Sequence, residues 1–499
     1  MLTLPEIRSR LKLDHFVNGT RVKALSRESY TSLNPCNQEE IGSFALGNEA
    51  DMERAVKAAR EAFDNGPWPK LSAAERSKIL GKFADVISKN ADFLGAVESY
   101  DVGKLYAECV NHDVARASAN IRFFTQLVET SGSEAFFNDA VFLGKKIKTV
   151  SITKRDPIGV AALISPWNSP LMLATWKIAP CLATGNCCVV KPAPWALLSV
   201  LQLGELANEA GIPPGVFNIV PAGVAGGKAL VSNPLVDRVS FTGSVPTGKA
   251  VNEANAKARL APVSLELGGK APSVVFSDAD LEFAVNGVAR GIFRSQGQSC
   301  VAGSRLLVEK AVYKKFMALL AEQTSGMKIG DQLDPKSEIG PVVTRDHLER
   351  IDGMVATAKT QGAALVCGGK RCSSAQLKAG NFYEPTIFED VNATMEIWKE
   401  EVFGPVLAVM AFDDESAAVG LANNTRFGLS ASLWTGNFER ALRVAHAIDS
   451  GMVWVNSHFV RDLRAPFGGV KESGIGSEGG KYSLDFYTKP KMICLPYSA

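Results

Sequence analysis

The sequence predicts an α/β fold with a doubly wound parallel sheet, and three observations support this prediction. From residue 157 onward, short apolar segments typical of buried strands alternate with amphipathic, helix-like segments. Strands without a polar face belong to parallel sheets that helices cover on both sides. The chain has 499 residues, and such a length is typical of about three structural units. We therefore expect a second α/β unit in addition to the first.

The N-terminal part is expected to be helical from Asp51 onward, before the first α/β unit begins. Apolar side chains recur there at the spacing of one helix face, at Met52, Ala55, Val56, Ala59 and Phe63. Another helix is expected to start at Ser72. Ser72 and Glu75 match a capping box, in which each side chain accepts a hydrogen bond from the other residue's backbone N–H.

The first α/β unit is predicted from residue 157 to about residue 267. Its five strands are expected at Val160–Ile164, Cys187–Lys191, Val216–Val220, Arg238–Thr242 and Val263–Leu267. Helices are expected over 171–182 and 197–210, with further helical segments between the later strands. This is the doubly wound arrangement that binds nucleotides, with the ligand beyond the carboxyl ends of the strands.

A second α/β unit is predicted to begin near Ala271. Its strands are expected at Ser273–Phe276, Arg305–Val308, Val406–Ala411 and Met452–Val455. Its helices are expected at Leu281–Ser295, Val312–Gln323 and Phe438–Ile448. The tail, Tyr487–Pro496, resembles an exposed strand without a partner nearby in sequence. Such a strand pairs with another element or with another subunit.

Composition and charge argue against several classes of protein. The net charge is +2, so a broad basic surface for nucleic acid is not expected. Residues 1–14 lack an apolar signal segment, and the apolar stretch 157–164 is too short to span a membrane. The nine cysteines match no disulfide scaffold, which favours a reducing cytoplasm. With five histidines and no Cys-x-x-Cys pair, no metal site is expected.

Three side chains suggest acyl chemistry. Cys300 follows a predicted helix in a polar loop, where a thiol can be exposed, although a lone cysteine is more often buried and inert. Glu266 is an acidic residue at the end of an apolar strand, where burial needs a partner or a function. Asn168 follows another buried strand, where its amide could donate to an oxyanion. No histidine lies near them in sequence, which weakens a Cys/His hydrolase interpretation. A thiol esterase or an acylating dehydrogenase remains an alternative.

The segment from Phe241 to Lys249 combines glycines with a strand-to-helix turn. Backbone N–H groups at such a helix start can bind an anion. The segment nearly matches the P-loop pattern, but Ala250 occupies the position that needs a hydroxyl for Mg²⁺. This difference argues against an NTPase. By itself, the segment fits a phosphate site and a plain turn equally well.

Taken together, these segments resemble the aldehyde dehydrogenase superfamily over nearly the whole chain and in the family's order. The tracts that carry the resemblance are Ser165-Pro-Trp-Asn168, Lys191-Pro-Ala193, Phe241-Thr-Gly-Ser244, Leu265-Glu-Leu-Gly-Gly-Lys270, Gly297-Gln-Ser-Cys300, Glu400-Glu-Val-Phe-Gly-Pro405 and Pro466-Phe-Gly-Gly469. The resemblance implies that Cys300 is the nucleophile, Glu266 the general base and Asn168 an oxyanion donor. It also implies that Glu478 relays protons and that Lys177 tunes the general base.

The same resemblance implies that the enzyme binds NAD. The cofactor-binding residues that it implies are Ser165, Pro166, Trp167, Lys191, Gly243, Ser244, Leu267, Gly268, Glu401 and Phe403. Many NAD-using relatives carry Glu after Lys-Pro-Ala, where this chain has Pro194. Without that carboxylate, nothing at this position repels a 2′-phosphate, so we expect that NADP is also accepted, with NAD somewhat favoured.

The tract from Phe459 to Phe467 carries three charges and resembles one branch of the family. That branch oxidises 2-hydroxymuconic, 5-carboxymethyl-2-hydroxymuconic and 2-aminomuconic semialdehydes from ring fission, as part of aromatic catabolism. The match implies that Arg116 and Arg464 hold the substrate carboxylate. The alternative is that Arg116 is solvated and that Arg464 pairs with Asp462. Further substrate-binding residues expected from the resemblance are Ser169, Trp176, Ser299 and Phe467, and the small Ser169 is expected to widen the pocket.

The resemblance also implies a domain organisation and a homodimer or homotetramer. The NAD(P)-binding domain is expected over 1–124 and 150–264, and the catalytic domain over 265–481. A bridging, oligomerising β arm is expected over 125–149 and 482–499, where 145–153 alternates like a strand. Two alternatives stay open: a dehydrogenase with broad specificity for aliphatic or aromatic aldehydes, and a non-enzymatic structural member of the fold.

Overall fold

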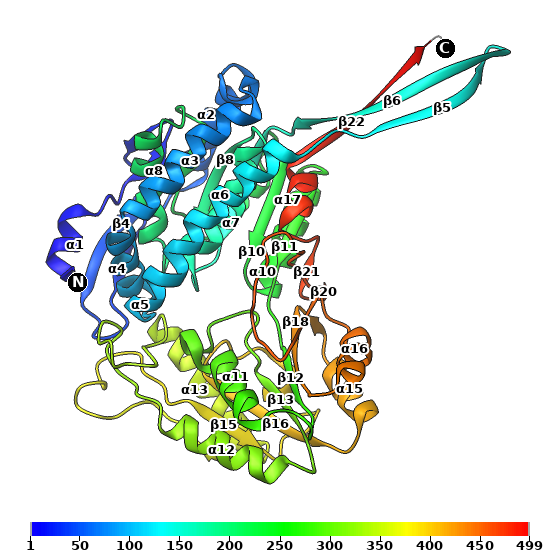
Figure 1. The fold of residues 1–499 in the computed structure, drawn as a ribbon. Coiled ribbons are helices and arrows are strands. Elements are labelled where there is room, and N and C mark those ends of the chain that lie inside the picture. Colours follow the sequence, from blue (N-terminus) through cyan, green and yellow to red (C-terminus); the bar gives the residue numbers. More distant parts are fainter. Residues whose placement is uncertain (1, 498–499) are drawn as a thin grey trace.

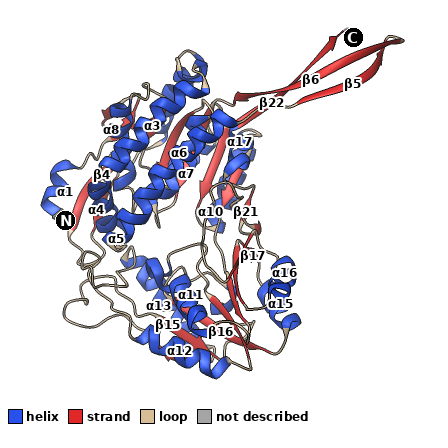
Figure 2. Cartoon of the chain, viewed as in Figure 1, coloured by secondary structure: helices blue, strands red, loops and turns tan. Residues whose placement is uncertain are grey.

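The computed structural model describes residues 2–497 and contains two α/β bodies and a protruding β arm (Figure 1, Figure 2). The predicted α/β class is confirmed. No helix in the described part of the chain is long and apolar enough to cross a membrane. All nine cysteines are free.

The first body is built on an eight-stranded sheet with the order β2-β1-β9-β8-β7-β10-β11-β21. Its five central strands are parallel and confirm the predicted ones: β7 (Val160–Ser165), β8 (Cys187–Pro192), β9 (Phe217–Ile219), β10 (Arg238–Thr242) and β11 (Val263–Glu266). The chain runs outward from β7 to β9 and then returns to β10 beside β7. The order therefore reverses between β7 and β10, which is where doubly wound sheets bind their ligands.

Antiparallel strands close both edges of this sheet. They are β1 (His15–Val17) and β2 (Thr20–Val22) at one edge and β21 (Gly474–Ile475) at the other. Further N-terminal elements are α1 (Leu4–Arg10), β3 (Ser29–Leu33), β4 (Glu40–Ala45), α4 (Ala91–Val102), α5 (Tyr106–Glu108) and a π-helical turn, Cys109–Val114. Of these elements, α4 and α5 lie in the stretch after Asp51 that was expected to be helical, whereas α1, β3, β4 and the π-helical turn are short and were not predicted.

Helices cover the central strands, of which β7, β8 and β9 are completely buried. One group that packs together is α3 (Ala73–Lys89), α6 (Ala115–Thr130), α7 (Pro170–Ala183) and α8 (Leu198–Ala210). A second group is α2 (Glu49–Asp64), α9 (Val224–Val231) and α10 (Val245–Ala258). The predicted capping box is present at the start of α3, where Ser72 N–H donates to Glu75 Oε2 over 2.7 Å.

The second body contains a seven-stranded sheet with the order β14-β15-β16-β13-β12-β18-β19. Its strands are β12 (Pro272–Val275), β13 (Arg305–Glu309), β14 (Ala364–Cys367), β15 (Thr386–Glu389), β16 (Val406–Phe412), β18 (Ser430–Trp434) and β19 (Met452–Val455). Its helices are α11 (Leu281–Phe293), α12 (Tyr313–Ser325), α13 (Arg345–Thr360), α14 (Glu396–Lys399), α15 (Glu415–Asn423) and α16 (Phe438–Ala447). The four predicted strands and three predicted helices are present, whereas β14, β15, β18 and α13 were not predicted. The helix predicted to reach Ser295 ends at Phe293, because Ser295 and Gln296 adopt left-handed backbone angles.

The arm is a three-stranded antiparallel sheet that extends from the first body (Figure 1). It contains β5 (Ala135–Phe142), β6 (Lys145–Pro157) and β22 (Thr488–Tyr497), with β6 in the centre. The predicted tail strand therefore finds its partner in the same chain. Short strands β17 (Phe427–Gly428) and β20 (Val470–Lys471) pair with each other, and α17 (Gly480–Tyr487) leads into β22. The expected domain bounds remain predictions.

Candidate active site

A cavity of about 940 Å³ lies at the carboxyl ends of the parallel strands of the first body. Ser165, Lys191, Thr242 and Glu266 line it, and each is at or near the end of a different strand (β7, β8, β10 and β11). The second body contributes Cys300 and residues from 347–350, 400–427 and 459–467, and Glu478 comes from the segment after the edge strand β21. The cavity is thus at the reversal of strand order that the sheet topology predicts.

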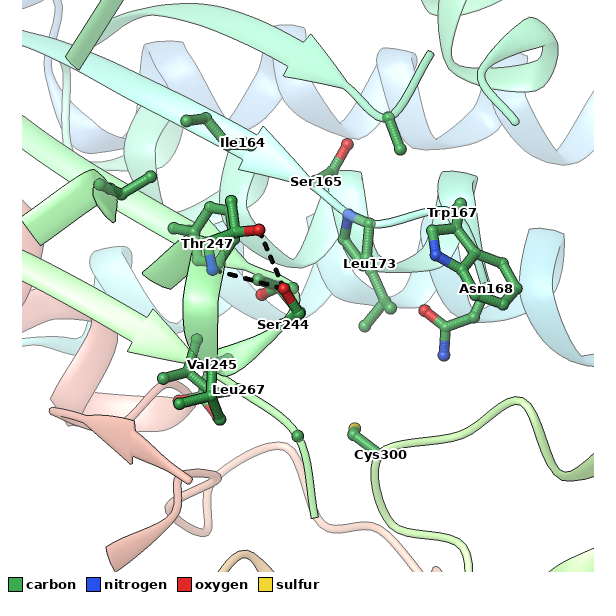
Figure 3. Close-up of a pocket in the computed structure, with 18 of the residues that line it drawn as sticks. Ile164, Ser165, Trp167, Asn168, Leu173, Ser244, Val245, Thr247, Leu267 and Cys300 are labelled. Carbon is green, nitrogen blue, oxygen red and sulfur yellow. Dashed lines mark hydrogen bonds between the residues drawn. The ribbon is translucent and has the colours of Figure 1, made fainter. Parts of the chain in front are cut away.

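Cys300, Asn168 and Glu266 all line this cavity, although they are far apart in sequence. Figure 3 shows the Asn168 amide and the Cys300 sulfur on facing sides of the opening. Asn168 Nδ2 donates one hydrogen bond to the Gln298 carbonyl over 3.0 Å, so the amide is oriented by the loop that carries Cys300. A Cβ atom at Gly269 would lie 2.2 Å from the Cys300 carbonyl oxygen. A glycine is needed there for the segment after Glu266 to approach the thiol.

The Glu266 carboxyl is buried, with 3% of the residue exposed. Neither oxygen has a hydrogen-bond partner among the described residues. Burial, together with the charge of Glu478, raises the pKa of Glu266 well above its ordinary value. The raised pKa makes the ionised carboxylate a stronger base than an exposed one, and both of its oxygens have free lone pairs beside the cavity.

Glu478 also lines the cavity and is held by two hydrogen-bonding groups from the first body. Lys177 Nζ lies 2.7 Å from Glu478 Oε1, and Ser240 Oγ donates to the same oxygen over 3.1 Å. Lys177 does not line the cavity. Its side chain is 1% exposed and also donates to Ser240 Oγ over 2.9 Å. Lys177 thus contacts the second acidic residue, Glu478, directly.

The Cys300 thiol is in surroundings that disfavour its ionised form. Burial and the nearby carboxylates of Glu401 and Glu266 raise the pKa of Cys300 to about 12. A thiolate forms there only when a base accepts the proton. The position of Cys300 in the cavity and its protonated thiol together suit a nucleophile that is unreactive until substrate binds.

All ten residues that the sequence suggested for the cofactor line the cavity. Ser244 is the N-cap of α10, and its hydroxyl accepts from the Thr247 N–H over 3.4 Å (Figure 3). The helix start therefore presents N–H groups to an anion. Lys191 is buried, and its Nζ contacts only the Pro192 carbonyl, at 3.4 Å, among the described residues. Burial lowers the pKa of Lys191 to about 8. A helix start and an amine without an acidic partner fit a dinucleotide.

Glu401 and Phe403 line the cavity, and helix α13 holds residues 401–403, here called the strap, through their backbone carbonyls. Arg350 donates to the carbonyls of Glu401 and Val402, each over 2.7 Å. His347 Nε2 lies 2.7 Å from the Phe403 carbonyl, and burial lowers the pKa of His347 to about 4, so the neutral ring donates. The Glu401 carboxylate accepts from the Gly269 N–H over 2.9 Å.

Next to the strap, the aromatic rings of Trp167, His347 and Phe403 line the cavity. Phe403 has a φ of 57°, a left-handed angle that costs energy in a residue with a side chain. The Trp167 ring packs edge-on against Phe403 and His347, at 5.2 and 5.3 Å between ring centres. His347 and Arg350 were not predicted as site residues, although their i, i+3 spacing puts them on one helix face.

Three of the six residues expected to bind substrate do not line the cavity: Arg464, Ser169 and Ser299. The Arg464 side chain is 80% exposed and pairs with Asp462 over 2.7 Å, which is the alternative stated above. Ser169 is buried, and its hydroxyl accepts from Lys104 Nζ; that the small residue widens the pocket stays a prediction. Arg116, Trp176 and Phe467 do line the cavity.

The arginine that lies with Arg116 beside the Trp176 ring is Arg461, not Arg464. The guanidinium groups of Arg116 and Arg461 lie 5.6 and 5.0 Å from the Trp176 ring centre, and Arg461 lies 4.5 Å from that of Phe467. Neither arginine forms an ion pair within residues 2–497; Arg116 Nε donates to Asn120 Oδ1 over 2.9 Å. Burial lowers the pKa of each to about 10, so both stay charged at neutral pH.

Comparisons with known proteins agree with this geometry. The sequence model of the aldehyde dehydrogenase family matches residues 22–493. Cytosolic aldehyde dehydrogenase 1 from Mus musculus is 39% identical over 99% of this chain and 98% of its own. Betaine aldehyde dehydrogenase from Bacillus subtilis (strain 168) is 40% identical over 96% of both chains. The 2-hydroxymuconic semialdehyde dehydrogenase from Pseudomonas sp. (strain CF600) is 39% identical over 97% of this chain and 99% of its own.

Solved structures give the same result. HpcC from Thermus thermophilus superposes with a TM-score of 0.94 at 42% identity, over 99% of this chain and 95% of that one. Betaine aldehyde dehydrogenase from Staphylococcus aureus, solved with NAD+, has a TM-score of 0.94 at 36% identity, over 98% and 96%. This chain therefore belongs to the aldehyde dehydrogenase family and is an NAD-dependent aldehyde dehydrogenase.

Proposed function

We propose that this enzyme oxidises an aldehyde that carries a carboxylate, such as a ring-fission semialdehyde of aromatic catabolism, to the corresponding acid. The observation that carries the proposal is the pair of unpaired guanidinium groups, Arg116 and Arg461, in the cavity that contains Cys300. Guanidinium groups bind carboxylates bidentately and with fixed geometry. A carboxylate held there would leave the other end of the substrate free to reach the thiol.

The same two charges bear on the alternatives. A cationic aldehyde such as betaine aldehyde would be repelled by Arg116 and Arg461. An aliphatic or aromatic aldehyde without charge would leave both guanidinium groups half-buried and without an anionic partner, at a cost in binding free energy. A carboxylated aldehyde avoids both penalties. Similarity to the Pseudomonas semialdehyde dehydrogenase also supports this choice.

The proposed roles follow from the arrangement. The Cys300 thiol gives its proton to solvent in the cavity, and the sulfur bonds to the aldehyde carbon while the carbonyl electron pair moves to the oxygen, which forms a thiohemiacetal. Asn168 stabilises the oxyanion with its second amide hydrogen, together with the Cys300 backbone N–H. NAD, when bound, accepts a hydride from that carbon. Glu266 then removes a proton from water, which attacks the thioester and releases the acid and the thiol. Glu478, held by Lys177, takes the proton onward.

Substrate screening with arginine variants tests the carboxylate proposal. We expect a carboxylated semialdehyde to have a higher kcat/KM than benzaldehyde or a short aliphatic aldehyde. Arg461→Met should raise KM for the carboxylated substrate about 10- to 100-fold, because hydrogen bonds to a charged group contribute about 1.5–3 kcal/mol. Arg464→Met is the matched control and should change nothing, because its side chain lies outside the cavity.

Two outcomes would contradict the proposal. A preference for small uncharged aldehydes, with Arg461→Met neutral, would favour a dehydrogenase of broad specificity. No reduction of either nicotinamide with any aldehyde would favour a structural member of the fold.

We further propose that the enzyme accepts NADP as well as NAD. Pro194 brings no charge to the cavity, and both Lys191 and Lys228 line it. Cations favour a 2′-phosphate, and no carboxylate at position 194 opposes it. The kcat/KM for NADP should fall within about 100-fold of that for NAD, a difference of less than about 3 kcal/mol. Rejection of NADP by more than about 1,000-fold would contradict this.

A further inference from the structure

A buried ion pair lies next to the cavity but does not line it. Lys104 and Asp113 are 2% and 0% exposed, and Lys104 Nζ contacts Asp113 Oδ2 directly. The other oxygen, Oδ1, lies 2.9 Å from His112 Nδ1. Two charges taken out of water are costly, and an apolar pair of the same size often gives equal stability. Stability alone therefore gives little reason for this pair.

Lys104 makes a second contact, which points to the active site. Its Nζ donates to Ser169 Oγ over 2.9 Å. Ser169 is the N-cap of α7 and follows Asn168 directly. Its hydroxyl makes no capping bond to the helix. The only side-chain hydrogen bond of Ser169 among the described residues is thus the one with Lys104. This bond holds the turn that carries Asn168 from the side away from the cavity.

Asp113 connects the same pair to the substrate side of the cavity. It lies in the π-helical turn Cys109–Val114, which leads directly into α6 and Arg116. Turns of this kind are rare and are frequent at functional sites. The ion pair therefore joins the segment before Arg116 to the turn that carries Asn168.

A second buried contact fixes the beginning of α7. Glu98 Oε2 accepts from the Leu171 N–H over 3.1 Å and from Ser199 Oγ over 2.6 Å. Glu98 does not line the cavity. The start of α7 is thus held by two buried groups that have no contact with the cavity.

We infer that Lys104 is a positioning residue: through Ser169 it fixes the Asn168 amide relative to Arg116 and to the Cys300 thiol. The inference rests on the proposed roles of Asn168 and Arg116. A displaced amide would still leave the cofactor and carboxylate contacts in place. The loss should therefore appear in kcat and not in KM.

A double-mutant cycle tests this inference. Ser169→Ala removes only the contact with Lys104, and it is measured both in the parent enzyme and in Asn168→Ala. In the parent enzyme we expect kcat to fall about 10-fold, because small misplacements of catalytic groups are costly, with both KM values nearly unchanged. In Asn168→Ala, Ser169→Ala should have no further effect, because it acts through that amide. The control is Ser77→Ala, which removes an equally buried hydroxyl that donates to the Thr125 carbonyl, away from the cavity.

The outcomes separate this inference from the proposed function. If Asn168→Ala itself keeps full kcat, the proposed oxyanion role is wrong. If Asn168→Ala is impaired but Ser169→Ala is not, or if the two effects simply multiply, the positioning role is wrong. The variant Lys104→Met with Asp113→Leu gives an independent check. It should keep the parent Tm but show the reduced kcat of Ser169→Ala; a full kcat would overturn the inference.

Discussion

Cys300 illustrates how the surroundings of one residue set its chemistry. Its sulfur is accessible from the cavity, yet burial and two neighbouring carboxylates raise its pKa to about 12. The pKa of Glu401 is itself raised to about 7 by burial, so the negative charge of this neighbour grows as the pH rises through neutrality. The thiol is thus protected from unwanted reactions until substrate and a base are in place.

Alkylation of Cys300 by iodoacetamide should report these charges. The rate should keep rising with pH across the alkaline range, because the thiolate fraction increases tenfold for each pH unit below the pKa. Glu401→Gln removes a negative neighbour and lowers the Cys300 pKa. The variant should therefore react faster than the parent above pH 7, and equally fast well below it, where Glu401 is already neutral.

Mass spectrometry of the Cys300 peptide gives the rate, and the exposed Cys494 on the arm gives the control. A plateau in the parent rate near neutral pH would contradict the raised pKa.

Residue types were enough to select Cys300, Glu266 and Asn168, because a thiol, a buried acid and an amide at strand or loop ends are unusual. They were not enough to choose between Arg461 and Arg464. Side chains three residues apart in an irregular segment point in directions that only the surrounding fold decides. Arg464 is exposed and forms an ion pair with Asp462, whereas the Arg461 guanidinium packs on the rings of Trp176 and Phe467 in the cavity.

At the scale of elements, the strands of the first body were the easiest to predict. β7 and β8 begin with unbroken apolar runs, Val160–Ile164 and Cys187–Val190, and both strands are fully buried because helices cover both faces of the sheet. Helix α13 was overlooked although Leu348, Ile351 and Val355 have helical spacing and are buried. The role of α13 in holding the strap could not be predicted from sequence. Its side chains bind backbone carbonyls about 50 residues away, and every residue type has such a carbonyl.

The strap held by α13 yields a prediction. Arg350→Met removes two charge-assisted hydrogen bonds to residues 401 and 402. The Kd for NAD should rise about 10-fold, equivalent to about 1.4 kcal/mol, since the strap would lose its fixed position.

Calorimetric titration with NAD measures this change. Arg345→Met is the matched control, because Arg345 is on the same helix but donates to the Ala379 carbonyl. An unchanged Kd in Arg350→Met would show that the strap keeps its position without α13.

At the scale of the molecule, the active site exists only because two bodies meet. Cys300 and the 401–403 strap come from the second body, and Asn168, Lys191 and Ser244 come from the first. The order of the motifs predicted which residues gather at the site. The periodicity of each segment, however, does not show how the two sheets face each other. The arm shows the same limit: its tail strand was predicted, whereas its pairing with β6 depends on the fold.

The arm also predicts self-association. Large apolar side chains are exposed on it, including Phe137 at 73% and Met492 at 67%. Exposed apolar surface of this extent is typical of interfaces. We expect a homodimer or homotetramer, which Phe137→Lys with Met492→Lys should shift toward the monomer.

Light scattering coupled to size-exclusion chromatography measures the mass. Val224→Lys, at an exposed apolar residue outside the arm, is the control. A parent enzyme that is monomeric at all concentrations would contradict the expectation.

The central claim is that Cys300 forms the covalent intermediate and that Glu266 activates the water that releases it. Rapid mixing of Glu266→Gln with NAD and a carboxylated semialdehyde, followed by mass analysis of the protein, tests both parts at once. The account predicts a single burst of one NADH per active site, little further turnover, and an acyl group on Cys300. Full turnover without an adduct, or an adduct on another residue, would contradict it.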